Sequence, residues 1–462
     1  MDLGQKFAQN IVETHYDDLS DEAVIAAKQA ILDTLGVMLA ATGVGEDVDK
    51  VVSLLDVLGG TDDCAVVCNN KRSNPVFAAM ANGAFGHSID YDDAHDDAFV
   101  HPSASVVPVA LTVGEYAKST GKDLVTAVAL GDDLIVRLGF ACSNPPENKG
   151  DLWMLPVSLG TFSATATASK LLGLDERQAF NALGIAYNRT AGSKELVIEA
   201  GSLRGLYSMF PAATGTLSAM LAKNGVPGFD EPFNGKAGFF HMFYRDVFDE
   251  GAFEEMGVRF DGTGISIKPW PCCRFTNSHV DAALAIAREH EVDPAKITKI
   301  TLYYCSDEAK RCLVPEEERK NPPSIPGAKL SLPFTVAAAL ADKKIEIRSF
   351  SDAKIKDPVI LGLTAKTVYE YDESLKSEFS KTMLPGKVRV EMEDGSVYEN
   401  RVDVVYGHPK NRMKWEDLVT KFRDCASFAK RKFSVGEINT IADAIEHLED
   451  VDDVSEIMNL VR

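Results

Sequence analysis

The chain has 462 residues, of which 45% are hydrophobic, and its 69 acidic side chains outnumber 48 basic ones for a net charge of −21. This length exceeds that of an ordinary single domain, so we expect two domains with a large core. The acidic surplus argues against general nucleic-acid binding, which requires basic surfaces. A few arginines in a pocket could still hold a small anionic substrate.

The cysteines and the N-terminus indicate the compartment. Eight cysteines are scattered along the chain without a CxxC pair or a zinc-ribbon spacing, which is typical of reduced thiols. The opening segment MDLGQKFAQN lacks the basic and apolar regions of a secretory signal, and no run of about eighteen apolar residues occurs. The sequence therefore predicts a cytoplasmic protein with no membrane span.

Helical patterns dominate the first half of the chain. Apolar residues recur at helical spacing after Ser20, which is expected to cap this helix, and Thr42-Gly43 is expected to end it. Asp175 and Gln178 have the spacing of a capping box. Small apolar residues predict further closely packed helices over segments 104–118, 124–139 and 157–172.

The pattern changes near residue 265. A helix is predicted over 277–290, and segment 297–305 alternates β-branched and polar residues as a half-buried strand does. A second alternating stretch, 387–406, is interrupted by Asp394-Gly395, which predicts a β-hairpin. After residue 407 the chain becomes helical again.

These elements predict a mainly α fold with two domains. Residues 1–265 plus 408–462 form the large all-helical domain, which is built from both chain ends. Residues 266–407 form a smaller α+β lid domain that is inserted into it.

The densest polar cluster of the chain is segment 87–102. It lies between two apolar segments of small residues, and packed helices normally avoid such groups between them. Acid–base chemistry or ion binding would explain the cluster. Its members are His87, Asp90, Asp92, Asp93, His95, Asp96, Asp97 and His101.

A metal site is the competing interpretation of this cluster, since histidine and aspartate are common ligands. The calcium-loop pattern fails, because a loop that begins at Asp90 has His95 where glycine is required and His101 where glutamate is required. The zinc motif HExxH is absent from the sequence. We therefore expect no metal and no other cofactor.

Three segments carry a family resemblance: NGAFGHSIDYDDAH with the following HPS, GTFSATATASKLLGL, and KPWPCCRFTN. They resemble the MmgE/PrpD family, which includes 2-methylcitrate dehydratase, cis-aconitate decarboxylase and iminodisuccinate epimerase. The resemblance covers most of the chain, and the DYDD and HPS block is its most specific part. It implies a homodimer, an active site between the domains, and metal-independent proton transfer next to a carboxylate of a small di- or tricarboxylate.

The resemblance implies that Asp90 is an acid–base carboxylate and that His101 faces the substrate. A carboxylate in a partly dry cleft can have a raised pKa, and imidazole titrates near neutral pH, so both groups suit proton transfer. Tyr207 is a further candidate acid. The structural alternatives are an aspartate that only caps a helix or lies in a surface loop, and a histidine that only binds its own loop.

The other charged residues of the cluster are expected to play lesser roles. His87 and Asp93 could orient the two catalytic candidates. Four further residues are expected to be solvated loop groups: Asp92, His95, Asp96 and Asp97.

Four basic residues are predicted to bind substrate carboxylates. Arg204 stands where the family generally has an active-site lysine, and it should hold charge rather than act as a base, because arginine keeps its proton; the alternative is a surface arginine. Lys268 and Arg274 lie in the KPWPCCRFTN motif. Arg189 replaces a glutamine that is common in the family and could be a third anion contact.

The chain also departs from the family pattern. Met154, which is also predicted to contact the substrate, replaces a histidine, Tyr207 replaces a histidine or glutamine, and the nearby segment 209–212 is bulkier and more apolar. At least one acid–base group of the better-known members is therefore missing.

Three hypotheses remain open. The leading one is a lyase that dehydrates or decarboxylates a small di- or tricarboxylate. The second is an epimerase or isomerase of a small dicarboxylate such as an iminodisuccinate-like compound. The third is a homologue that binds carboxylates and has lost its activity.

Overall fold

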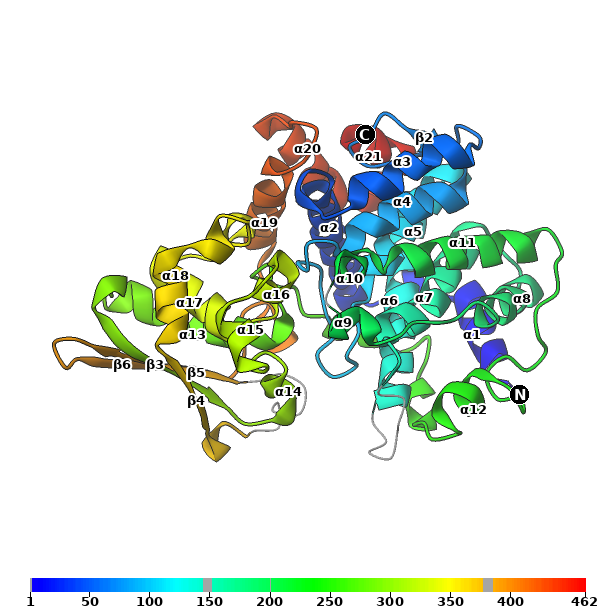
Figure 1. The fold of residues 1–462 in the computed structure, drawn as a ribbon. Helices are drawn as coiled ribbons and strands as arrows, with labels where there is room; N and C mark the ends of the chain where they lie inside the picture. The colour runs from blue at the N-terminus through cyan, green and yellow to red at the C-terminus, as the bar shows by residue number, and fades with distance from the viewer. Residues whose placement is uncertain (1, 144–151, 200, 377–384) are drawn as a thin grey trace. The chain divides into compact units, whose positions relative to one another are not determined.

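The computed structural model describes residues 2–143, 152–199, 201–376 and 385–462 (Figure 1). The chain forms two compact units, one made of Met1–Ile265 with Lys414–Arg462 and the other of Ser266–Met413. The first unit is helical, whereas the second combines helices with a four-stranded sheet. The prediction of a mainly α fold with a smaller α+β region is confirmed.

The second unit ends at Met413, whereas the sequence pattern placed its boundary at residue 407. The backbone N–H of Ile267 donates to the carbonyl of Gly407, and that of Gly407 donates to the carbonyl of Asn411, both at 2.9 Å. A Cβ at Gly407 would lie 1.9 Å from the carbonyl oxygen of Ile267. Glycine is therefore required where the end of this unit returns to its beginning.

Helix α2 (Asp21–Val44) lies in the core of the first unit. The hydroxyl of Ser20 accepts a hydrogen bond from the N–H of Ala23 at 3.2 Å, which confirms the predicted cap. By length and composition α2 could cross a membrane, and 72% of its most apolar window is buried within the protein. A core helix meets the same criteria, and the burial of α2 is that of a core helix.

Helix α2 ends at Val44, one residue after the predicted stop at Thr42-Gly43. Helix α19 (Trp415–Ser427), near the C-terminus, packs against α2. A Cβ at Gly43 would lie 1.9 Å from the carbonyl oxygen of Phe428, the residue that follows α19. Gly43 therefore permits a close approach of the two chain ends.

The other predicted helices of this unit are also present, and the capping box of Asp175 and Gln178 has both of its hydrogen bonds, at 2.8 and 3.1 Å. Helices α7 and α11 pack against each other, and α7 also packs on α6. The larger helices besides α2 and α19 are α1 (Leu3–Glu13), α3 (Val48–Leu58), α4 (Pro75–His87), α5 (Ser103–Ala117), α6 (Gly121–Ser143), α7 (Leu155–Leu171), α8 (Glu176–Tyr187), α11 (Met209–Lys223) and α20 (Val435–Glu446). The shorter elements are α9 (Glu195–Ile198), α10 (Ser202–Leu206), α12 (Phe239–Tyr244), α21 (Ser455–Val461), β1 (Cys64–Ala65) and β2 (Arg72–Ser73).

The second unit is built on a sheet with the strand order β4-β3-β5-β6. Strands β3 and β4 are parallel, whereas β5 is antiparallel to both β3 and β6, so the predicted hairpin around Asp394-Gly395 is confirmed. The strands are β3 (Ile297–Tyr304), β4 (Thr367–Tyr371), β5 (Gly386–Met392) and β6 (Val397–Val402). The helices are α13 (Asn277–Glu289), α14 (Asp307–Lys310), α15 (Glu316–Lys320), α16 (Ile325–Lys329), α17 (Leu332–Asp342) and α18 (Pro358–Ala365).

One apolar core holds this unit together. It joins the inward side chains of β3 and β5 to those of α13 and α17, and α13 also packs on β6. The alternating burial of β5 follows from its alternating sequence, since successive side chains of a strand point to opposite faces.

Candidate functional site

The polar segment 88–102 connects α4 to α5 in the first unit. His87 is the last residue of α4, and the N–H of Asp90 donates to the carbonyl of His87 at 2.9 Å. Asp90 has a φ of 55°, in the left-handed region that aspartate tolerates better than most residues. The chain therefore turns sharply directly after α4, at the residue predicted to be catalytic.

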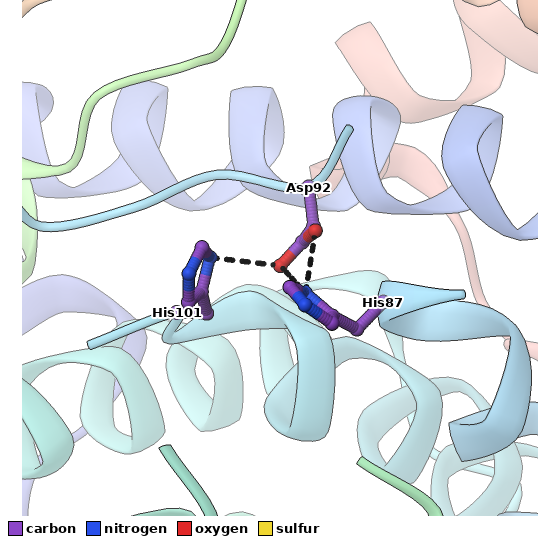
Figure 2. A group of neighbouring side chains, drawn as sticks. All are labelled: His87, Asp92 and His101. Atoms are coloured by element: carbon purple, nitrogen blue, oxygen red, sulfur yellow. Dashed lines mark hydrogen bonds and ion pairs between the residues drawn. The ribbon is translucent and has the colours of Figure 1, made fainter. Parts of the chain in front are cut away.

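Two histidines share one aspartate in this segment, as Figure 2 shows. Nδ1 of His87 lies 2.8 and 2.9 Å from the two carboxylate oxygens of Asp92. Nδ1 of His101 lies 3.0 Å from Oδ2 of the same carboxylate and 2.7 Å from the backbone oxygen of Asp93. We call these three residues the histidine–aspartate cluster.

The members of this cluster differ in exposure. The side chains of His87 and Asp92 are 1% and 0% exposed, whereas that of His101 is 21% exposed. Burial lowers the pKa of His87, although the charge of Asp92 acts in the opposite direction. Nε2 of His87 is buried without a hydrogen-bond partner among the described residues. His87 is therefore a neutral, enclosed imidazole, and His101 is the member that reaches the surface.

Asp90 and Arg204 form an ion pair. Nη2 of Arg204, in α10, lies 2.8 Å from Oδ2 of Asp90, and the two side chains are 10% and 5% exposed. The alternative of a solvated surface arginine is therefore wrong. A guanidinium has five N–H donors, so it can bind Asp90 and a second carboxylate at once.

Tyr207 lies directly after α10 and is completely buried. Its ring centroid is 4.5 Å from that of His87. Burial, followed by the nearby charges of Asp92 and Asp90, raises the pKa of Tyr207 well above its ordinary value. Its hydroxyl therefore stays protonated, and no hydrogen-bond partner for it exists among the described residues.

Met154 lies in an apolar environment. Met154, Val157 and Tyr207 form one buried hydrophobic cluster, against which Leu196 and Val197 pack. A methionine offers no proton donor here, so the phenol of Tyr207 is the polar group of this cluster.

The prediction that Asp92, His95 and Asp96 are solvated is wrong, because they are 0%, 6% and 7% exposed. The ring of His95 packs edge-on against Phe140 at 5.2 Å, and its Nδ1 accepts a hydrogen bond from the N–H of Ala98. Asp97 is exposed, as predicted. The segment folds inward because its polar groups find partners within the protein.

Two further buried carboxyl groups, those of Asp93 and Asp132, are linked through Ser103. The N–H of Ser103 donates to Oδ1 of Asp93 at 3.2 Å, and its hydroxyl donates to Oδ2 of Asp132 at 3.1 Å. Burial raises the pKa of Asp93 to about 7 and that of Asp132 well above its ordinary value. Sequence reasoning missed Asp132, although two adjacent aspartates within the apolar pattern of α6 were a usable signal.

Lys421 of α19 supports the same segment from the C-terminal end of the chain. Its Nζ lies 2.6 Å from the Asp33 carboxylate, donates to the backbone oxygen of Tyr91 at 2.9 Å, and lies 3.9 Å from the centre of the Tyr91 ring. No local pattern could have indicated this contact, since Asp33, Tyr91 and Lys421 lie on three distant segments.

The three other predicted substrate-binding residues belong to other segments of the chain. Arg189 is exposed in the turn after α8, and no described residue forms an ion pair with its side chain. Lys268 and Arg274 belong to the second unit, where Lys268 is completely buried and Arg274 is half-buried at the start of a short 3-10 helix (Arg274–Thr276). The binding roles of these three residues stay predictions.

The histidine–aspartate cluster is also a candidate metal site, because one possible ligand atom from each residue lies within 4.8 Å of the others. Its geometry fits hydrogen bonds better. Two tetrahedral zinc ligands at ordinary bond lengths are about 3.3 Å apart, whereas the closest nitrogen–oxygen distances here are 2.8 to 3.0 Å. The carbonyl of Asp93 also requires a hydrogen, not a metal, on Nδ1 of His101.

Comparison with known proteins extends over both units. The chain matches the MmgE/PrpD N-terminal domain over residues 5–250 and the MmgE/PrpD C-terminal domain over residues 270–446. The cis-aconitate decarboxylase of Mus musculus is 28% identical, over 99% of this chain and 93% of its own. That of Homo sapiens is 27% identical over 100% and 94%, and that of an Aspergillus terreus strain is 26% identical over 96% and 93%.

Proposed function

The chain belongs to the MmgE/PrpD family, and from this premise we propose that it is a lyase that decarboxylates cis-aconitate or a closely similar unsaturated tricarboxylate. The observation that carries the proposal is the full-length similarity to relatives named cis-aconitate decarboxylase in two mammals and a fungus. The arrangement of Asp90, Arg204, His101 and Tyr207 supports it, since anion-binding and proton-carrying groups converge in the first unit.

The chemistry sets three requirements. The bond between a carboxylate carbon and its neighbour breaks, carbon dioxide leaves, and the electron pair stays on the remaining carbon skeleton. That carbanion spreads into the adjacent double bond and carboxylate until an acid protonates it. The site must therefore hold carboxylates, stabilise the developing negative charge and supply one proton in each turnover.

Arg204 and Asp90 meet the first two requirements. The Arg204 guanidinium has N–H donors beyond the one that binds Asp90, so it can hold a substrate carboxylate and stabilise charge that develops beside it. Asp90 fixes the orientation of this guanidinium from one side. In the proposed mechanism Arg204 binds charge and does not act as a base, and Asp90 is the candidate acid–base carboxylate next to the reacting carbon.

His101 and Tyr207 are the two groups suited to supply the proton that each turnover requires. His101 is half-buried and bound through Nδ1, so a proton delivered to the substrate would leave from Nε2. Tyr207 keeps its proton because burial raises its pKa, and its hydroxyl has no protein partner to compete with a substrate among the described residues.

The remaining properties are proposals from the same family resemblance. The enzyme is a homodimer in the cytoplasm and works without a metal or another cofactor. Its partner is a small polycarboxylate, and no nucleic acid or membrane is involved. The net charge of −21, the burial of α2 and the hydrogen-bond distances of the histidine–aspartate cluster support these proposals.

The test is incubation of the full-length chain with cis-aconitate in deuterated water, followed by proton NMR. The expected product is an unsaturated dicarboxylate that lacks one carboxylate and carries one deuterium. Addition of water to the double bond would identify a dehydratase that runs in reverse, and deuterium exchange or double-bond isomerisation without loss of carbon dioxide would identify an isomerase or epimerase. No turnover across a panel of di- and tricarboxylates would contradict the proposal and support an inactive homologue.

A further inference from the structure

We infer that Asp92 is a positioning residue that holds His87 and His101 with hydrogen on Nδ1, so that His101 presents an unprotonated Nε2 toward the site. The inference rests on the proposed function in one respect, namely that His101 transfers the proton. Asp92 itself is completely buried and acts through the two rings, so it is not a catalytic residue.

The tautomer of His101 follows from its two neighbours. Nδ1 lies 2.7 Å from the backbone oxygen of Asp93 and 3.0 Å from Oδ2 of Asp92. A carbonyl oxygen only accepts hydrogen bonds, and so does an ionised carboxylate. The hydrogen must therefore be on Nδ1, which leaves the lone pair of the neutral ring on Nε2.

The tautomer of His87 follows from the same carboxylate. Its Nδ1 is within 2.8 and 2.9 Å of both oxygens of Asp92, so an ionised Asp92 receives a hydrogen from this ring as well. A buried carboxylate requires such donors, because a charge without them is costly in a dry environment. His87 therefore holds Asp92 in place, while Asp92 orients both rings.

The arrangement has a direct consequence for proton transfer. His101 is the only one of the three that is appreciably exposed, so a proton enters and leaves the cluster through its Nε2. When Nε2 is protonated, the ring carries a positive charge beside the negative charge of Asp92. A carboxylate that fixes the tautomer and stabilises the imidazolium has this role in other histidine-dependent enzymes.

Labelled histidine tests the tautomers directly. Ring nitrogen signals of the full-length protein, recorded by NMR at alkaline pH where histidine is neutral, distinguish hydrogen on Nδ1 from hydrogen on Nε2. The His87→Gln and His101→Gln variants assign the two rings. Both rings should carry hydrogen on Nδ1, and hydrogen on Nε2 of either ring would overturn the inference, whether or not the protein is active.

The Asp92→Asn variant tests the consequence for the reaction. The amide replaces one acceptor oxygen by an NH2 donor, which opposes the Nδ1–H of His87, since this nitrogen lies 2.8 and 2.9 Å from the two carboxylate oxygens. We therefore expect His87 to change, because His101 keeps the Asp93 carbonyl. The kcat should fall about 100-fold or more while KM changes less than about threefold, since orientation of an acid–base group is lost and not substrate binding. Asp97→Asn, an exposed aspartate of the same segment, is the matched control and should leave both constants unchanged.

A kcat of Asp92→Asn within about threefold of the parent would overturn the inference, since general acid–base catalysis contributes far more. If this variant fails to fold, the histidine tautomers measured in the parent protein still test the inference. If the parent turns over no tricarboxylate, the proposed function fails, and the same NMR measurement separates that failure from a failure of the positioning role.

Discussion

The ammonium group of Lys421 lies 2.6 Å from the carboxylate of Asp33, with side chains that are 5% and 0% exposed. Lys421 is in α19, near the C-terminus, whereas Asp33 is in α2, near the N-terminus. The same ammonium group binds the backbone oxygen of Tyr91, between Asp90 and Asp92. One buried ion pair therefore joins the two chain ends of the first unit to the segment that carries its site.

Removal of this lysine should destabilise the protein strongly. Lys421→Met leaves the Asp33 charge buried beside an apolar side chain, and breaking a buried ion pair in this way costs about 3–5 kcal/mol. The free energy of unfolding in urea measures the effect. Lys430→Met is the control, because its ion pair with Asp49 is largely exposed and should contribute less than about 1 kcal/mol. Equal losses in the two variants would contradict the role of the buried pair.

A lysine at position 204 should weaken substrate binding. Arg204→Lys keeps the charge but removes the forked donor geometry with which a guanidinium can hold Asp90 and a substrate carboxylate together. We expect KM for the tricarboxylate to rise about tenfold, equivalent to roughly 1.4 kcal/mol. The control is Arg177→Lys, whose arginine forms an exposed ion pair with Asp230. An unchanged KM in Arg204→Lys would show that Arg204 serves only to hold Asp90.

Loss of the Tyr207 hydroxyl should lower activity without lowering stability. Its oxygen is buried without a partner among the described residues, so Tyr207→Phe removes no protein hydrogen bond that the structure records and should leave stability equal or higher. If the phenol protonates the substrate, kcat falls about 100-fold or more.

The control for this change is Tyr187→Phe. Tyr187 donates to the carbonyl of Ala237, so this variant should lose about 1 kcal/mol of stability and keep its kcat. A Tyr207→Phe variant with full kcat would assign proton delivery to His101 alone.

The buried carboxyl of Asp93 should make stability fall with rising pH. Burial raises its pKa to about 7 in the folded protein, whereas an aspartate in an unfolded chain titrates near about 3.9. Between these values the folded protein holds a proton that the unfolded chain has released, so this contribution to stability is lost as pH rises toward 7.

The Asp93→Asn variant isolates that contribution. Its amide keeps an oxygen for the Ser103 N–H but cannot ionise, so its stability relative to the parent should increase from pH 4 to 7 and then level off. Urea unfolding at about pH 5 and pH 8 measures the difference. A difference of equal size at both values would rule out titration of Asp93, and Asp97→Asn provides the exposed reference.

Elements with a local cause could be predicted well. Ser20 caps α2, and the alternating stretch around Asp394-Gly395 forms a hairpin, because side-chain caps and turn residues act within a few positions of the chain. Gly43 shows what such reasoning misses. It lies one residue before the end of α2, and a distant segment, at Phe428, approaches it closely.

The candidate site also combines features that local sequence predicts with features that depend on distant segments. The pattern of segment 87–102 singled out the candidate residues, and the structure places Asp90 against Arg204. The burial of Asp92, His95 and Asp96 could not be read from an acidic loop sequence, because burial depends on what packs over the loop. Lys421, which supports this loop, is invisible to any local pattern.

The sequence by itself determined the helix caps, the hairpin, the mainly α composition and the segment with acid–base side chains. These properties depend on neighbouring residues and on residue chemistry. Only the tertiary structure decided that Asp92 is shared by His87 and His101, that Asp90 meets Arg204, and that Asp33 meets Lys421. The last two of these contacts join segments far apart in the chain, and the burial of all these side chains depends on how such distant segments pack around them.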